Sequence, residues 1–315
     1  MRAAVLEGPR QVAVREVPPA PLAARKVRVQ VEEAGLCGSD LALWEGRPWF
    51  RYPQAPGAPG HEAWGRVVAV GEGADGFRPD DLVTGLFHGA LAEQVDAAPE
   101  ELMAVPPALA KQGLLGEPLA CAANAVARSG VQAGETVAVV GIGFQGALIT
   151  ALCAAAGARV LALSRRPFAL RTALRHGAAA ALAADANAVK AVEEHTRRQL
   201  CDRVFEVTGK QEPLDLATKL TKTRGTLVIA GYHQDGPRTV DLWLWNWRGL
   251  DVVNAHERDP RAYLAGMRRA AEAVVSGKVD PAPLYTHHFP LDEVAEAFRA
   301  LEHRPDGFLK AVVRP

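Results

Sequence analysis

The stretch ETVAVVGIGFQGALITALCAAAGARVLALSRR, residues 135–166, decides the fold of this 315-residue chain. β-Branched residues crowd into TVAVV, three glycines follow, an alanine-rich segment comes next, and ARVLAL is a second apolar run. This order predicts a strand, a tight turn, a helix and another strand, which is the βαβ unit of a doubly wound parallel sheet. The apolar run 137–158 is also long enough for a membrane span, but its glycines and β-branched cluster favour strand, turn and helix.

The glycines of this turn form the pattern G-x-G-x-x-G at Gly141, Gly143 and Gly146. The first glycine permits the turn, the second lets the backbone approach a pyrophosphate, and the third lets the helix pack on the strand. The helix N-terminus then faces the phosphates, so we predict a dinucleotide site here. The other predicted cofactor contacts lie in this turn or at the ends of later strands: Phe144, Gln145, Val207, Thr208 and Gly231.

The end of the second strand selects between the two nicotinamide cofactors. An NAD site carries Asp or Glu there to bind the ribose 2′-hydroxyl. This chain has Ser164, Arg165 and Arg166 instead. A hydroxyl and two guanidinium groups would accept a 2′-phosphate that a carboxylate would repel, so we predict NADP(H).

Length and composition describe an ordinary two-domain globular protein. The chain is 49% hydrophobic and 23% charged, and its formal net charge is zero, so no overall field attracts nucleic acid or an anionic membrane. The cysteines lie far apart, which argues against a disulfide framework and suits a reducing cytoplasm. The N-terminus lacks the apolar run of a signal peptide.

The predicted secondary structure changes at about residue 117. Short strands divided by Gly and Pro turns fill the first part, and strands alternating with alanine-rich helices follow. Two helices and two strands are expected after residue 258. The segment LWLWNWRGL is interpreted as a strand with Trp243, Trp245 and Trp247 on one face, either a core or subunit-interface stripe or a cleft wall.

Four residues of metal-binding type occur in short glycine- or proline-containing motifs. Cys37 lies in GLCGSD, His61 and Glu62 lie in PGHE, and Glu117 lies in GEPLA. One thiolate, one imidazole and one or two carboxylates suit Zn²⁺ with an open coordination position. Each residue alone also has an ordinary structural explanation, as a small buried cysteine, a loop histidine or a surface acid.

Together with the glycine pattern, and in this order, these motifs resemble the zinc-dependent medium-chain dehydrogenase/reductase superfamily, especially its sorbitol and threonine dehydrogenase branch. The resemblance covers nearly the whole chain. It implies an α/β protein with a chaperonin-10-like β-barrel catalytic domain, residues 1–116 and 259–315, and a doubly wound Rossmann NADP-binding domain, residues 117–258.

The resemblance also implies roles for individual residues. Cys37 and His61 match catalytic zinc ligands, Glu62 matches an acid that ligates or approaches the metal, and Glu117 stands where the alcohol dehydrogenase branch has a third, cysteine ligand. Ser39 matches the hydroxyl that touches the substrate oxygen and starts proton relay. The implied reaction is hydride transfer between NADP(H) and a secondary alcohol or ketone, with a polyol or cyclitol as candidate substrate, in a homodimer or homotetramer.

The sequence departs from the family pattern at two places. No cysteine occurs between residues 37 and 121, so the lobe that carries a structural zinc in many members is expected to be deleted, leaving one zinc per chain. The histidine that follows the Ser-Asp pair in some relatives is absent, and His88 is a candidate replacement. Two alternatives stay open: a zinc-free quinone or enoyl reductase of the same superfamily, and a non-catalytic NADPH-binding regulatory protein.

Overall fold

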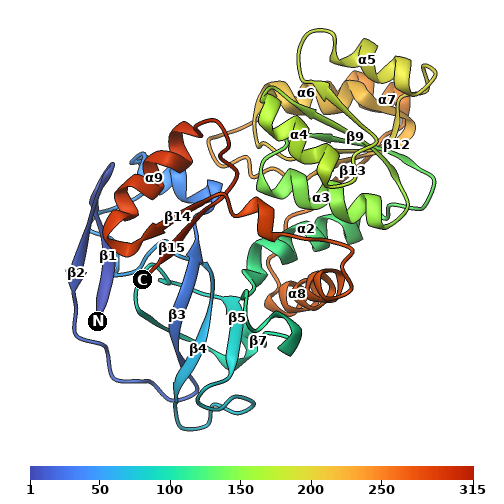
Figure 1. Cartoon of the computed structure of the whole chain (residues 1–315). Helices are drawn as coiled ribbons and strands as arrows, with labels where there is room; N and C mark the ends of the chain where they lie inside the picture. Colours follow the sequence, from blue (N-terminus) through green and yellow to red (C-terminus); the bar gives the residue numbers. More distant parts are fainter. The chain divides into compact units, whose positions relative to one another are not determined.

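The computed structural model describes all 315 residues, which divide into two compact units. Unit 1 consists of Met1–Ala120, Arg258–Val275 and Ala282–Pro315, and unit 2 of Cys121–Glu257 and Ser276–Pro281. Figure 1 shows the chain with its helices and strands labelled. None of the helices combines the length and apolar character needed to cross a bilayer.

Unit 2 is built on a six-stranded parallel sheet with the strand order β10-β9-β8-β11-β12-β13. Its strands are β8 (Thr136–Val140), β9 (Arg159–Ser164), β10 (Ala180–Ala183), β11 (Cys201–Glu206), β12 (Thr221–Ile229) and β13 (Asp251–Asn254). Counted along the chain, this is the order 3-2-1-4-5-6 of dinucleotide-binding folds. The prediction of a doubly wound sheet is therefore confirmed.

Helices connect these strands: α3 (Phe144–Ala155), α4 (Pro167–Arg175), α5 (Ala188–His195), α6 (Gln211–Leu220) and α7 (Leu242–Arg248). Strands buried on both faces are continuous apolar runs, as in β8, where four successive residues are buried. The strand order reverses between β8 and β11, so the carboxyl ends of these two strands form the switch point where such sheets bind ligands.

The tryptophan segment is a helix, so the prediction of a strand with three tryptophans on one face was wrong. Asp241 caps α7 by accepting from Leu244 N at 2.9 Å, and Gly249 ends the helix in the left-handed conformation. The i, i+4 spacing of a helix brings Trp243 and Trp247 together on one exposed face. Trp245 lies elsewhere on the helix and packs against the unit 2 core.

Unit 1 contains a seven-stranded sheet and the hairpin of β1 (Arg2–Gly8) and β2 (Gln11–Glu16). The sheet has the order β14-β15-β3-β4-β5-β7, and β6 pairs with β3. Its strands are β3 (Val27–Gly35), β4 (Glu62–Val70), β5 (Leu82–Leu86), β6 (Gln94–Ala97), β7 (Leu102–Ala104), β14 (His287–Pro290) and β15 (Ala311–Arg314). The accompanying helices are α1 (Leu41–Trp44), α8 (Pro260–Val275) and α9 (Val294–His303). Helix α2 (Gly116–Ser129) begins in unit 1 and continues into unit 2.

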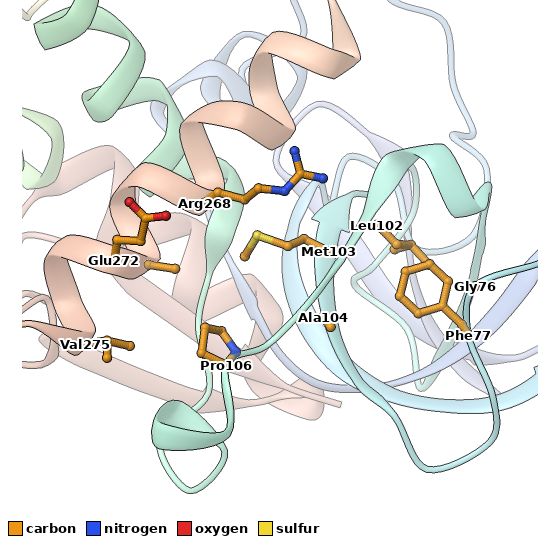
Figure 2. Close-up of a pocket in the computed structure, with 10 residues that line it drawn as sticks. Gly76, Phe77, Leu102, Met103, Ala104, Pro106, Arg268, Glu272 and Val275 are labelled. Atoms are coloured by element: carbon orange, nitrogen blue, oxygen red, sulfur yellow. The ribbon is translucent and has the colours of Figure 1, made fainter.

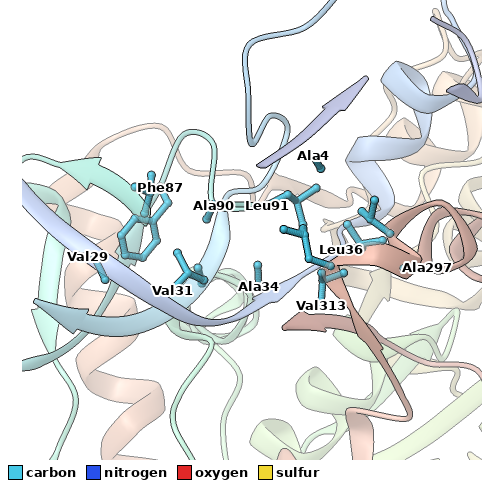
Figure 3. Packing of buried hydrophobic residues seen from close by; sticks show 14 of the residues in the cluster. Ala4, Val29, Val31, Ala34, Leu36, Phe87, Ala90, Leu91, Ala297 and Val313 are labelled. Carbon is cyan, nitrogen blue, oxygen red and sulfur yellow. The ribbon is translucent and has the colours of Figure 1, made fainter. Parts of the chain in front are cut away.

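The core of unit 1 gathers side chains from segments far apart in the sequence. Strand β3 alternates in burial and sends Val29 and Val31 into this core, as expected for a half-buried strand. Figure 3 shows these two valines with Phe87, Leu91 and, from the C-terminal strand, Val313. The C-terminal strand therefore completes the same core that the N-terminal strands begin.

Candidate functional site

Three of the four predicted metal-binding residues come together in unit 1. Cys37 follows β3, His61 directly precedes β4, and Glu62 begins β4. The antiparallel pairing of these strands sets Gly35 opposite Glu62, which brings the cysteine loop beside the histidine. One donor atom from each of Cys37, His61 and Glu62 lies within 4.8 Å of the other two.

The donor cluster fits a zinc ion in chemistry and in size. Sulfur, imidazole nitrogen and carboxylate oxygen are the donors that Zn²⁺ takes in proteins. In a tetrahedral site with metal–donor bonds of about 2.0–2.3 Å, the donors lie about 3.5 Å apart. The observed spread of 4.8 Å needs only a small contraction to reach this arrangement.

Asp40 orients the histidine of this cluster. It is buried, its Oδ1 lies 3.4 Å from His61 Nδ1, and its Oδ2 accepts a hydrogen bond from Cys37 N at 2.8 Å. His61 Nδ1 also lies 3.2 Å from the carbonyl oxygen of Pro59. Because both partners accept, the proton belongs on Nδ1 and Nε2 is left for a metal. The signal for Asp40 in the sequence was its place three residues after Cys37.

Burial and neighbouring charges shift the pKa values of His61 and Asp40 in opposite directions. Burial alone would lower the pKa of His61, but Asp40, Cys37 and Glu117 together raise it well above its usual value. Burial raises the pKa of Asp40 to about 6, against the opposing effects of His61 and the Cys37 N–H. The metal-free site therefore favours a proton on His61 that a bound cation would displace.

Lys310 on the loop before β15 is a second residue that sequence reasoning missed. It is buried and forms an ion pair with Glu62 Oε2. Burial would lower the pKa of Lys310, but Glu62 and Cys37 raise it. A Cβ on Gly35 would lie 2.4 Å from Glu62 Oε2, so a larger residue here would displace the carboxylate of this pair.

The remaining predicted residues of this site lie around the cluster. Ser39 is half-buried on the short 3₁₀ helix Gly38–Asp40, and its hydroxyl makes no hydrogen bond within the chain. Glu117 is buried in the first turn of α2, close enough to raise the pKa of His61 but outside the tight donor group. His88 is 81% exposed and faces Glu101 at 3.8 Å, which offers no support for a relay role.

The glycine-rich turn of unit 2 has the geometry that a pyrophosphate requires. Gly141 has φ +102°, and a Cβ on Gly146 would lie 2.0 Å from the Gly141 oxygen, so the turn and the helix packing both need glycine. A Cβ on Gly143 would meet nothing within 4 Å, which leaves open space at the start of α3. Phe144 and Gln145 form the first turn of that helix.

The two arginines after β9 differ in their surroundings. Arg166 NH2 donates to the carbonyl oxygen of Ile142 at 3.3 Å, and its backbone N donates to Ser164 Oγ at 3.2 Å. Arg165 is exposed and makes no ion pair or hydrogen bond within the chain. Arg166 therefore braces the glycine-rich turn, and Arg165 is available to a ligand.

Glu206, at the end of β11, organises the other predicted cofactor contacts and was also missed. This buried carboxylate accepts from Thr208 N at 2.6 Å and from Gly209 N at 2.9 Å, while Val207 N donates to the carbonyl of Val140. Its other oxygen lies 3.0 Å from His233 Nε2. A lone acid in the apolar run VFEV was the available signal.

The loop after β12 is held to the same residue, through both its backbone carbonyl and its carboxylate. Gly231 N donates to the Glu206 carbonyl at 2.8 Å, and a Cβ on Gly231 would lie 2.6 Å from Glu206 Oε2. Arg238 Nε donates to His233 Nδ1 at 2.9 Å, which leaves the imidazole proton on Nε2, facing Glu206. The ends of β11 and β12 are thus fixed by a single hydrogen-bonded network around the buried Glu206.

Comparisons with known proteins assign both parts of the chain to one family. A family model described as "Alcohol dehydrogenase GroES-like domain" matches residues 23–128, and one described as "Zinc-binding dehydrogenase" matches residues 145–271. The 2-dehydro-3-deoxy-L-galactonate 5-dehydrogenase of Pseudoalteromonas atlantica is 30% identical to the chain, and the match covers 92% of each protein. The chain belongs to the zinc-dependent medium-chain dehydrogenase/reductase superfamily.

Two solved structures of similar proteins cover the whole of this medium-chain dehydrogenase. The 2R,3R-butanediol dehydrogenase from Bacillus subtilis has a TM-score of 0.87 and 26% identity, covering 100% of this chain and 99% of its own. A zinc-binding dehydrogenase from Sinorhizobium meliloti, bound to NADP, has a TM-score of 0.86 and 28% identity with the same coverage. The expectation of a chaperonin-10-like domain followed by a Rossmann domain is confirmed.

The connection between β5 and β6 is short in this medium-chain dehydrogenase. Residues 87–93 alone connect β5 to β6, and no cysteine lies among them. The prediction that this lobe is missing therefore agrees with a short connection in the structure.

A groove of about 590 Å³ also lies within unit 1 of this dehydrogenase, between β7 and α8. Figure 2 shows Phe77 and Met103 on one side, and Arg268 and Glu272 projecting from α8 on the other. None of the predicted metal or cofactor residues lines it.

Proposed function

We propose that this protein is a zinc-dependent dehydrogenase that transfers a hydride between NADP(H) and a secondary alcohol or ketone. The observation that carries the proposal is the cluster of one thiol, one imidazole and one carboxylate within 4.8 Å. A zinc-free reductase of the superfamily would have no need for this donor set. Residues 1–116 and 259–315 are proposed as the catalytic domain and residues 117–258 as the cofactor domain.

The residues of the cluster have distinct proposed tasks. Cys37 and His61 hold the metal, and Asp40 keeps the His61 proton on Nδ1. Glu62 and Glu117 supply carboxylates, and the metal or Lys310 balances their negative charge. A zinc ion bound here would polarise a carbonyl or favour ionisation of an alcohol near neutral pH. Ser39 Oγ, which has no partner in the chain, accepts the proton from the substrate hydroxyl.

The cofactor residues hold and orient a dinucleotide. The open space at Gly143 and the first turn of α3 receive the pyrophosphate, and the Glu206 network keeps Thr208 and Gly231 in place. NADP(H) supplies or accepts the hydride at its nicotinamide ring. Arg165, free and exposed beside Ser164, supports NADP over NAD, as does the NADP-bound relative from S. meliloti.

The substrate class is proposed from the relatives together with the site. The curated relatives include an (R,R)-butanediol dehydrogenase from Neisseria gonorrhoeae. They also include a sorbitol dehydrogenase from Bacillus subtilis, which is named after a polyol. We propose a polyol or cyclitol. The test is a panel of polyols, cyclitols and simple secondary alcohols with NADP⁺ and with NAD⁺, using protein of measured zinc content. Less than about half a zinc per chain, or no turnover with any of them, would contradict the proposal.

We also propose that the protein is a homodimer or homotetramer formed through α7 and the edge strand β13. Trp243 and Trp247 are 71% and 76% exposed and stack with ring centroids 6.1 Å apart. These two indoles would bury roughly 350 Å² of the ~800 Å² that a partner contributes to a standard interface. Sedimentation of the full chain measures the oligomeric state, and a monomer at micromolar concentration would contradict the proposal.

Arg165→Ala is expected to weaken NADPH binding by about 1.5–3 kcal/mol, the scale of hydrogen bonds to charged groups. NADH binding should hardly change, because NADH lacks the 2′-phosphate that Arg165 would contact. Titration of cofactor fluorescence measures both affinities. Arg175→Ala, which removes an exposed arginine at the end of α4, is the control and should leave both unchanged. Equal use of both cofactors by the unmutated protein would contradict the NADP prediction.

Glu117→Gln is expected to lower zinc affinity or turnover about 10–100-fold, the usual effect of losing a residue that supports a metal ligand. The substitution keeps the size of the side chain and removes its charge beside His61. If Glu117 binds the metal directly, the loss should be larger. Zinc competition with a chromophoric chelator measures the affinity, and Cys121→Ser on the same helix is the control. Loss of zinc from Cys121→Ser but not from Glu117→Gln would identify the cysteine as the third ligand.

A further inference from the structure

Thr84 on β5 is a buried residue whose hydroxyl joins two separate segments of unit 1. Its Oγ1 donates to the carbonyl oxygen of Ala63 at 2.8 Å and accepts from the backbone N of Gly116 at 2.9 Å. The residue is fully buried, so water does not compete for either hydrogen bond. One side-chain oxygen therefore links β4 to the start of α2.

Both partners of this hydroxyl are neighbours of proposed metal residues. Ala63 follows Glu62 directly on β4, and Gly116 directly precedes Glu117 at the first position of α2. The spacing between the His61–Glu62 segment and Glu117 thus depends on two hydrogen bonds through a single oxygen atom.

The contact at Gly116 is also tight. The first N–H groups of a helix have no partner inside the helix, so Thr84 supplies an acceptor that α2 itself lacks. A Cβ on Gly116 would lie 2.7 Å from Thr84 Cγ2 and 2.9 Å from its Oγ1. A side chain at this position would therefore press against Thr84, and the start of α2 has little freedom to move toward or away from β5.

We propose that Thr84 is a positioning residue of the metal site, which holds Glu117 at its working distance from the donors on β4. The inference rests on the proposed function, because it requires Glu117 to serve the metal. The hydroxyl of Thr84 binds backbone atoms of Ala63 and Gly116 and not a metal donor. Its effect is transmitted through the backbone of Ala63 and Gly116.

The test replaces the hydroxyl without changing the shape of the side chain. Thr84→Val should weaken zinc binding about 10–100-fold, as for residues that support a metal ligand. The visible spectrum of the cobalt-substituted protein should change too, because it reports ligand geometry independently of turnover. Thr84→Ser keeps the hydroxyl and should restore both the affinity and the spectrum.

A matched control lies in unit 2. Thr221 is equally buried, and its hydroxyl donates to the carbonyl of Ala217 at 2.8 Å. Thr221→Val removes a buried hydroxyl away from the metal residues and should leave zinc affinity and the cobalt spectrum unchanged. Gly116→Ala perturbs the same contact from the other side and should reproduce the effect of Thr84→Val.

Unchanged zinc affinity and an unchanged cobalt spectrum in Thr84→Val would overturn the inference. If that variant does not fold, the same two measurements on Gly116→Ala decide the question in the same way. The proposed function is tested separately by Cys37→Ser and Glu117→Gln. If these variants lose zinc while Thr84→Val retains it, only the role of Thr84 is wrong; if they too retain zinc, the proposed metal site is wrong.

Discussion

Cys37→Ser is expected to abolish stable zinc binding and to reduce turnover by at least about 100-fold, more than the usual loss for a residue outside the ligand set. A serine hydroxyl keeps the size of the side chain but replaces a thiolate, the strongest donor in the cluster, with a weak one. Metal analysis after dialysis and turnover with the best substrate of the panel measure the two effects.

NADPH binding provides the internal reference for this variant. The predicted cofactor residues lie in unit 2, whereas Cys37 lies in unit 1, so the cofactor affinity should be retained. Cys121→Ser is the matched control, because it makes the same substitution at another free cysteine and should keep the zinc. Full zinc occupancy in Cys37→Ser would remove Cys37 from the ligand set.

Lys310→Met is expected to destabilise the metal-free protein by about 3–5 kcal/mol, the cost of leaving one charge of a buried pair uncompensated. Methionine keeps much of the length of lysine and removes the ammonium that faces Glu62 Oε2. The loss should be smaller in zinc-saturated protein, because a bound cation would balance the Glu62 charge. Urea unfolding with and without zinc measures both values.

The neighbouring ion pair on β15 is a control for burial. Arg314 pairs with Glu33 at 2.7 Å, but its side chain is 62% exposed, so Arg314→Met should cost only about 0–1 kcal/mol. In the metal-free protein, Lys310→Met combined with Glu62→Gln should recover most of the stability, since no buried charge is then left alone. A cost below about 1 kcal/mol for Lys310→Met alone would show that the pair does not stabilise the fold.

Local patterns in the sequence predicted much of the fold and the components of the site. The β-branched run, the glycines and the alanine-rich helix of residues 135–166 predicted a βαβ unit, because strand propensity, turn chemistry and helix periodicity are all local properties. The glycine spacing also predicted which backbone positions must stay open. Cys37, His61 and Glu62 were recognisable because each lies in a short motif beside a turn.

Local patterns failed where the same spacing of apolar residues is compatible with both a strand and a helix. The tryptophans of LWLWNWR alternate as in a strand, yet the segment forms a helix because Asp241 caps its start and Gly249 ends it. The sequence pattern could not decide between the two, since alternation over so few residues does not exclude a helix. The outcome depended on capping contacts and on the packing of Trp245 against the unit 2 core.

The sequence by itself determined the fold class and the glycine-rich turn, and it indicated the candidate metal donors, because each depends on residues that are close together in the chain. Only the tertiary structure decided which distant residues support them. Lys310 lies 248 positions after Glu62, and Thr84 reaches Gly116 across 32 positions. Strand pairing and the burial of charge bring such partners together, and neither can be inferred from the local sequence pattern.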